Sequence, residues 1–171
     1  MKKILLISDT HGHLDPALKA HVEAADEVWH AGDIGEEFPL DTFLKGKEFK
    51  AVYGNIDGTT LRQQFPEELF FTCETLPVYI THIGGYPGKY PAKIKARLKD
   101  LKPGLFICGH SHILKVMYDQ TLGLLHLNPG ACGVQGFHQV KTALRFEVHA
   151  QELKNMAVIE LGKRNSITTH E

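Results

Sequence analysis

The chain has 171 residues, 43% of them hydrophobic, a length that suits one domain with a sizeable core and is too short for two. Nineteen Lys and Arg residues against 20 Asp and Glu residues leave a formal charge of −1, which excludes a general electrostatic attraction to nucleic acid or to an anionic membrane. The three cysteines have no CxxC spacing, which argues against a disulfide framework and a thiolate zinc site and fits a reducing cytoplasm.

The first predicted strand covers residues 3–8, "KILLIS", whose continuous apolar run is typical of a strand covered on both faces. The run stops at Ser8 and Asp9, too early for a signal peptide or a membrane span. We therefore expect one cytoplasmic domain over residues 1–171, without targeting or membrane segments.

A helix is predicted next, with Asp15 as its N-cap and Pro16 as its first residue. Further strands are predicted at residues 27–31, 49–53, 77–81 and 104–108, and a second helix at residues 91–102. This alternation of strands and helices indicates an α/β fold.

The last third of the chain has a different pattern. Residues 113–119, 122–128, 142–148 and 156–161 are apolar runs separated by short polar or Gly-containing connections, and this pattern predicts antiparallel strands. We expect two sheets, with the second completing a sandwich.

Each of the five early strands is followed directly by polar side chains of the kinds that bind metals. These candidates are Asp9, His11, Asp33, Asn55, His82, His110 and His112. The carboxyl ends of strands in open α/β sheets are where ligands bind, so these side chains are expected to meet at one edge. Gly32, Gly54 and Gly109 allow tight turns there.

Seven ligands are too many for one tetrahedral ion and fit two ions that share a bridging carboxylate. Two divalent ions carry four positive charges, and the two aspartates cancel only two of them, so the site should attract a phosphate ester. Two such ions also lower the pKa of a bridging water.

The ordered motifs "DTH", "GD", "GN", a lone His after a strand and "GHSH" resemble the calcineurin-like metallophosphoesterase superfamily, specifically its small YfcE-like phosphodiesterase branch. The resemblance implies a four-layer α/β/β/α sandwich of two mixed sheets, with a binuclear metal site at the strand ends and a metal-bridging hydroxide as nucleophile. It implies that Asp33 bridges the two ions. One ion would be held by Asp9, His11, Asp33 and His112, and the other by Asp33, Asn55, His82 and His110.

Two positions depart from the family pattern. Many relatives place a proton-donating His after the Gly-Asn motif, whereas this chain has Ile56, so that general acid is missing. Relatives commonly read His-Gly-His after the fourth strand, whereas this chain has Ile83 after His82, without the second His.

Several residues around the predicted site have two possible roles. His30 is predicted to pack or to support a ligand, and Asp57 to orient a ligand or shape a turn. Asn128 is predicted to fix a turn beside the site. The candidate substrate-binding residues are Tyr86, Lys89 and His138, and His138 is also a candidate for the missing proton donor.

The predicted function is a metal-dependent phosphodiesterase for a small phosphate ester, with Asp33, Asn55 and His82 taking part in catalysis. Mixed His, Asp and Asn ligation suits Mn best, with Fe, Zn or Ni as alternatives. A phosphomonoesterase is the second reading, and a nuclease is disfavoured by the charge. The remaining alternative is a binding scaffold, as in the retromer subunit that resembles this branch. A homo-oligomer is left open.

Overall fold

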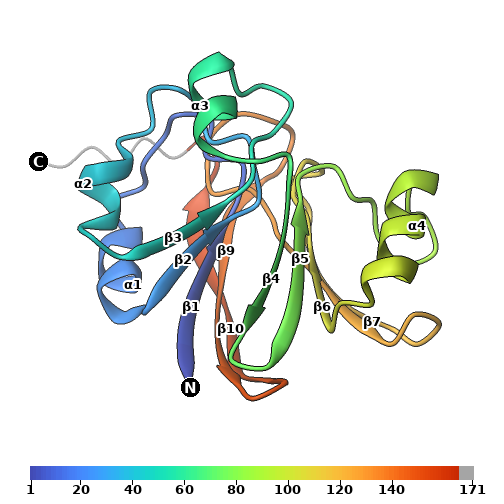
Figure 1. Ribbon diagram of the computed structural model, residues 1–171. Helices are drawn as coiled ribbons and strands as arrows, with labels where there is room; N and C mark the ends of the chain where they lie inside the picture. The colour runs from blue at the N-terminus through green and yellow to red at the C-terminus, as the bar shows by residue number, and fades with distance from the viewer. Residues whose placement is uncertain (166–171) are drawn as a thin grey trace, which may run out of the picture.

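Two five-stranded mixed sheets form the centre of the molecule in the computed structural model, which describes residues 1–165 (Figure 1). The first sheet has the order β10-β9-β1-β2-β3, in which β1, β2 and β3 are parallel and β9 is antiparallel to both of its neighbours. Its strands are β1 (Lys2–Ile7), β2 (Glu27–His30), β3 (Glu48–Ala51), β9 (Val140–His149) and β10 (Glu152–Lys163).

The second sheet has the order β4-β5-β6-β8-β7. Its three central strands are parallel, and each edge strand is antiparallel to its neighbour. The strands are β4 (Glu68–Cys73), β5 (Leu76–Thr81), β6 (Leu105–Ile107), β7 (Leu114–Asp119) and β8 (Leu124–Pro129).

Alternating side chains of β1 show how the layers are built. Ile4 and Leu6 enter the core between the two sheets, whereas Leu5 and Ile7 face outward and pack against helices. Successive side chains of a strand point to opposite faces, so a strand covered on both faces is apolar throughout. This explains the unbroken run of residues 3–8.

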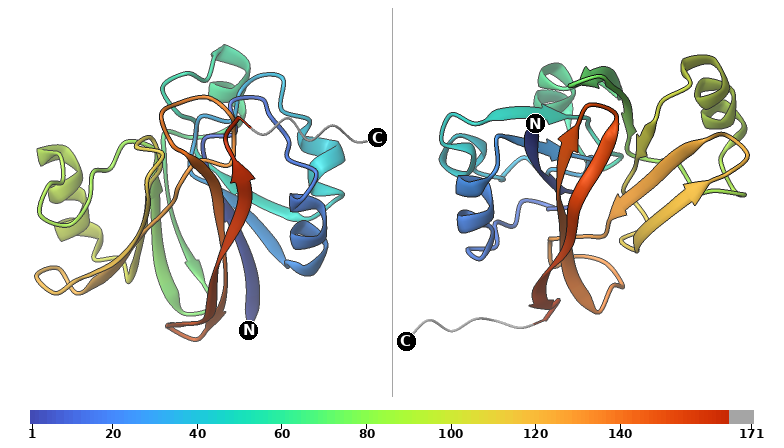
Figure 2. Two further views of the ribbon diagram at one scale, coloured as in Figure 1. Left: turned by 180° about the vertical axis from the view of Figure 1, so that it is seen from behind. Right: turned by 90° about the horizontal axis from the view of Figure 1, so that it is seen from below.

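Helices cover both outer faces, as Figure 2 shows from behind and from below. The first sheet is covered by α1 (Leu18–Ala24), α2 (Leu40–Leu44) and α3 (Thr59–Gln64). The second is covered by α4 (Ala92–Leu101), whose Ile94 and Leu98 pack on Tyr79 and Phe106. The predicted four-layer sandwich with two mixed sheets is confirmed. None of the helices in residues 1–165 is long and apolar enough to cross a membrane.

Three details of the predicted elements are wrong. The first helix begins at Leu18, because Asp15 and Pro16 form a preceding turn in which Asp15 Oδ1 accepts the amide of Ala17 at 2.9 Å. The last four strands are not all antiparallel, because β8 pairs in parallel with β6. These four strands also divide between the two sheets, since β9 pairs with β1.

His126 in β8 leads to a prediction about pH and stability. Burial, followed by the charge of Lys115, lowers the pKa of this histidine to about 4, so the folded protein holds it neutral. The unfolded chain takes up the proton below about pH 6.5, so stability is lost as the pH falls from there to about 4. We expect His126 to contribute about 3 kcal/mol to this loss. Urea unfolding across this range should show a smaller pH slope for His126→Leu, and an unchanged slope would contradict the assignment.

Candidate metal centre

All seven predicted ligands lie at one edge of the sandwich, on the loops that leave the carboxyl ends of β1, β2, β3, β5 and β6. They form two groups that could each hold a metal ion. Asp9, His11 and His112 form the first group, and Asp33, His82 and His110 the second, with the ligand atoms of each group within 4.8 Å of one another. Asn55 belongs to the second group, because its Oδ1 lies 3.1 Å from His82 Nε2 and 3.0 Å from His110 Nδ1.

Asp9 presents one oxygen atom to the site and anchors the other. Its Oδ2 accepts hydrogen bonds from the Ser8 hydroxyl at 2.6 Å and from the His110 amide at 3.1 Å. Its Oδ1 lies 3.1 Å from His112 Nε2. Oδ1 is buried, and neither it nor His11 Nε2 has a hydrogen-bond partner within residues 1–165. Buried polar atoms are nearly always paired, so this donor set fits a cation that both atoms would bind.

Asp33 lies between the two groups. Its Oδ2 is 3.4 Å from His11 Nε2 in the first group, and its Oδ1 is 3.2 Å from His82 Nε2 in the second. Burial acts to raise the pKa of this carboxyl, but the hydrogen bond and charge of His82 in its protonated form, together with the Ile56 amide, outweigh it and hold the pKa below its ordinary value. The charged carboxylate therefore faces both groups at once.

Two of the histidines are oriented by hydrogen bonds of their second ring nitrogen. His82 Nδ1 lies 2.7 Å from the carbonyl oxygen of Ala31, an acceptor that requires this nitrogen to carry the proton. His138 Nε2 likewise donates to the Gly133 carbonyl at 2.8 Å, so its Nδ1 accepts a hydrogen bond from His112 Nδ1 at 3.3 Å. When these two rings are neutral, each Nε2 lone pair faces the centre, which is the tautomer that binds a metal.

Five of the seven candidates have left-handed backbone conformations, which are uncommon for residues other than glycine. Their φ angles are 54° at Asp9, 47° at His11, 54° at Asp33, 68° at His110 and 61° at His112. Such strain persists where the surrounding structure compensates for it, and it concentrates at functional sites.

Two glycines allow the loops to approach the ligands closely. A Cβ atom at Gly54 would lie 2.0 Å from Asp33 Oδ1, and one at Gly32 would lie 2.5 Å from His82 Nδ1. Neither position has room for a side chain, so the packing of the ligands explains both glycines.

Residues behind the ligands fasten these loops to one another. Buried His30 accepts the Gly32 amide at Nδ1 and contacts Thr10 Oγ1 at 2.9 Å through Nε2, and burial lowers its pKa to about 4. Asn128 donates to the Gly109 carbonyl at 3.0 Å and accepts the Gly130 amide at 3.0 Å. Both residues thus hold loops that carry ligands.

Asp57 connects the two loops on either side of Asp33. Its carboxylate accepts the amides of Ile34 at 3.1 Å, Gly35 at 2.9 Å and Gly54 at 2.8 Å, and the side chain is buried. It therefore shapes backbone and contacts none of the candidate ligand side chains through a hydrogen bond within residues 1–165.

Replacing this carboxylate should destabilise the protein, because it leaves buried amides unpaired. We expect Asp57→Ala to lower the free energy of unfolding by about 3 kcal/mol. Asp100→Ala, which removes an exposed carboxylate on α4, is the matched control. Urea unfolding measures both variants, and equal effects would contradict this role of Asp57.

A cavity of about 340 Å³ adjoins the second group, and Asn55 and His82 form part of its wall. The predicted substrate-binding residues do not line it. Tyr86 lies under the Lys115 ammonium group, 4.0 Å from the ring centre, and the exposed Lys89 bonds to Tyr86 through its backbone amide. His138 contacts His112 instead. Substrate contacts by these three residues stay predictions.

The cavity reveals two cationic residues that sequence reasoning missed, Arg62 on α3 and Lys93 on α4. Neither lies near a recognisable motif, and only the packing of α3 and α4 around the β5 end brings them together.

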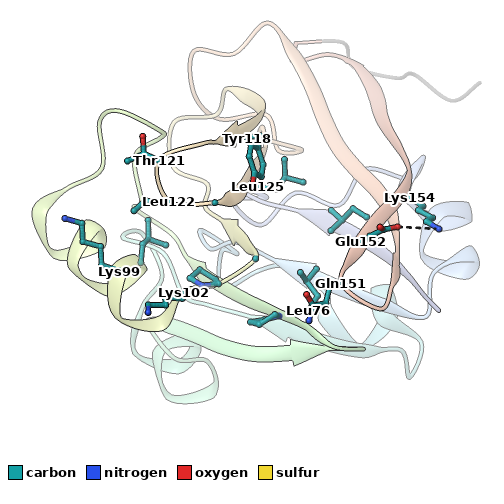
Figure 3. A pocket seen from close by; sticks show the side chains of 16 residues that line it. Leu76, Lys99, Lys102, Tyr118, Thr121, Leu122, Leu125, Gln151, Glu152 and Lys154 are labelled. Atoms are coloured by element: carbon teal, nitrogen blue, oxygen red, sulfur yellow. Dashed lines mark ion pairs between the residues drawn. The ribbon is translucent and has the colours of Figure 1, made fainter.

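A larger pocket, of about 980 Å³, lies among α4, the β7–β8 turn and the β9–β10 turn, and none of the seven candidate ligands lines it (Figure 3).

Comparison with known proteins agrees with the family resemblance of the sequence motifs. The family model for the calcineurin-like phosphoesterase superfamily domain matches residues 1–171. Among curated proteins, none matches the chain.

Several solved structures share the fold. An archaeal phosphodiesterase is 24% identical, with a TM-score of 0.70 over 92% of this chain and 99% of that one. A predicted phosphoesterase from Streptococcus pneumoniae is 20% identical, with a TM-score of 0.68 over 94% of this chain and 90% of that one. Vps29 from Entamoeba histolytica, solved with Zn²⁺, is 18% identical, with a TM-score of 0.69 over 94% and 99% of the two chains.

Proposed function

The chain belongs to the calcineurin-like phosphoesterase superfamily, and we propose from this premise that it hydrolyses small phosphodiesters with the help of two divalent metal ions. The observation that carries the proposal is the position of Asp33, whose two oxygens face the two groups of ligands separately. One ion would be held by Asp9, His11, Asp33 and His112. The other would be held by Asp33, Asn55, His82 and His110.

When bound, two such ions lower the pKa of water and polarise the phosphoryl oxygens. Hydrogen bonds within the chain orient the side chains that would bind these ions. The Nδ1 protons of His82 and His112 are already committed to Ala31 and His138, so both rings keep a lone pair toward the centre. The two aspartates cancel only part of the charge of two divalent ions, so the loaded site attracts an anionic phosphate.

Ile56 occupies the position beside Asn55 where many relatives have a proton donor. Its amide donates to Asp33 Oδ1 at 3.1 Å, and its side chain is 47% exposed and has no proton to give. The leaving oxygen must therefore depart without help from this residue, which favours esters of acidic alcohols.

The similarity in fold to an archaeal phosphodiesterase supports a diester over a monoester as substrate. The cavity beside Asn55 and His82 offers space for one ester substituent, which either class of ester carries. A binding scaffold is the second candidate, favoured by the likeness to Vps29, a protein named for vacuolar protein sorting. The set of seven candidate ligands supports the enzyme, because hydrolysis by the proposed mechanism requires both ions.

Metal dependence is the first test. Metal-free protein should not hydrolyse bis(p-nitrophenyl) phosphate, and Mn²⁺ should restore more activity than Mg²⁺, because imidazole ligands suit transition metals better than the hard Mg²⁺. The release of p-nitrophenol measures the rate, with each metal alone as the control. Full activity in a chelator would contradict the two-metal proposal.

The same assay separates the alternatives. A rate on p-nitrophenyl phosphate that exceeds the rate on the diester indicates a phosphomonoesterase. Metal binding without hydrolysis of either ester with Mn, Fe, Zn or Ni would support the scaffold over the enzyme.

A further inference from the structure

The cavity beside the second ligand group has a mixed wall that matches one kind of ester substituent. Besides Asn55 and His82, the wall is formed by residues from α3, the start of β4, the end of β5 and the start of α4. At about 340 Å³ it lies at the lower end of the range for small-molecule sites. A ligand that fills it would lie against two candidate metal ligands, Asn55 and His82.

Arg62 is held in place on this wall. Its Nε donates to the Asp57 carbonyl at 2.6 Å, and its Nη2 lies 3.4 Å from the Asn55 carbonyl. The guanidinium carbon lies 4.6 Å from the centre of the Tyr53 ring. A guanidinium group has five N–H donors, so most of them are left for a ligand. The group is exposed and already oriented, which lowers the entropic cost of binding an anion.

Lys93 adds a second positive charge from the first turn of α4, a turn that has no side-chain cap. Two carboxylates, Glu67 and Glu68, line the same cavity. Glu68 is engaged by the Tyr79 hydroxyl at 2.6 Å and by an ion pair with Arg97. The charge of Lys93 also acts on Glu68 and helps to lower its pKa. With Arg97 counted beside Glu68, the charged side chains described at this cavity are three cations (Arg62, Lys93 and Arg97) and two carboxylates (Glu67 and Glu68).

Part of the remaining wall is apolar. Ile83, Pro91 and Ile94 line the cavity, and Ile83 follows directly after His82. A substituent that fills the cavity therefore contacts an apolar surface near the metal ligands and meets cationic groups on the same wall.

We propose that this cavity binds one ester substituent of the substrate, and that the substituent combines an apolar body with an anionic group recognised by Arg62 and Lys93. A nucleoside that carries a second phosphate is the chemical class that fits. The inference rests on the proposed function, since it takes Asn55 and His82 as metal ligands. It adds a specificity that the ligands themselves do not confer.

Two matched diesters test the proposal. Thymidine 5′-(p-nitrophenyl phosphate) and the same compound with a 3′-phosphate share the leaving group and the nucleoside and differ by one anionic group. The kcat/KM ratio of the 3′-phosphorylated ester to the other should fall about 10-fold in Arg62→Ala, and also fall in Lys93→Ala, through KM. Glu67→Gln should raise the ratio. Lys99→Ala, which lies in the larger pocket, should leave it unchanged.

Binding provides a readout that does not depend on hydrolysis. Calorimetry of the metal-loaded protein should show tighter binding of thymidine 3′,5′-bisphosphate than of thymidine 5′-monophosphate, and Arg62→Ala and added salt should both reduce this difference. Hydrolysis of neither ester by the unmodified protein would contradict the proposed function, and the binding difference would then decide the inference alone. An unchanged ratio or unchanged binding difference in Arg62→Ala, with equal losses on both esters, would overturn the inference and leave Arg62 as a support for the Asn55 loop.

Discussion

Asp33→Asn is expected to lower kcat/KM for bis(p-nitrophenyl) phosphate by at least about 10³-fold and to reduce the occupancy of both metal positions. The reason is geometric, because one carboxylate oxygen faces His11 and the other faces His82. An amide presents one oxygen and one NH₂ group, so it cannot offer an acceptor to both ions.

Metal analysis of the purified variant distinguishes this role from a general loss of structure. Asp100→Asn changes an exposed carboxylate on α4 and should keep full metal content and activity. Near-ultraviolet circular dichroism should show that Asp33→Asn keeps its tertiary packing. Loss of a single equivalent of metal, with the second position still filled, would rule out the bridging role.

Hydrolysis by the unmodified protein should depend steeply on the leaving group. Ile56 supplies no proton, so the departing oxygen must carry its charge without help from this residue. We expect aryl diesters of acidic phenols to react far faster than alkyl diesters. A plot of log rate against the pKa of the leaving group measures this directly, and a nearly flat line would mean that another residue acts as the acid.

Introducing a proton donor should reduce this dependence. We expect Ile56→His to speed the hydrolysis of poor leaving groups by about 10-fold and to change good ones little. The neighbouring Asp57 is already occupied by three backbone amides, so it is not free to orient an imidazole at this position, which limits the gain. Ile56→Gln, a polar side chain without an acidic proton, is the matched control and should give no acceleration.

The candidate ligands could be predicted from the sequence because each follows an apolar strand directly. Both faces of β1 are apolar, with Leu5 and Ile7 on one face and Ile4 and Leu6 on the other, so both faces must be covered. Parallel strands bring their carboxyl ends to one edge of the sheet. For these segments, the strands and ligand positions predicted from the local sequence pattern therefore agree with the overall fold.

Other parts depended on contacts that no local pattern carries. The helices α2 and α3 have only five and six residues, too few for a periodic pattern, and β4 is an edge strand whose Phe70 is exposed. Arg62 and Lys93 line the cavity together with residues from several other elements, which no local pattern brings together. The contact between His138 and His112 likewise depends on the course of the loop before His138, which no local pattern shows.

A metal titration tests whether this site uses two metal ions to hydrolyse phosphodiesters. Metal-free protein is titrated with Mn²⁺ while bound metal and the rate on bis(p-nitrophenyl) phosphate are followed together. We predict binding of two equivalents per chain, with activity rising in step with the second. Full activity with one equivalent or with none would show that hydrolysis does not need two ions.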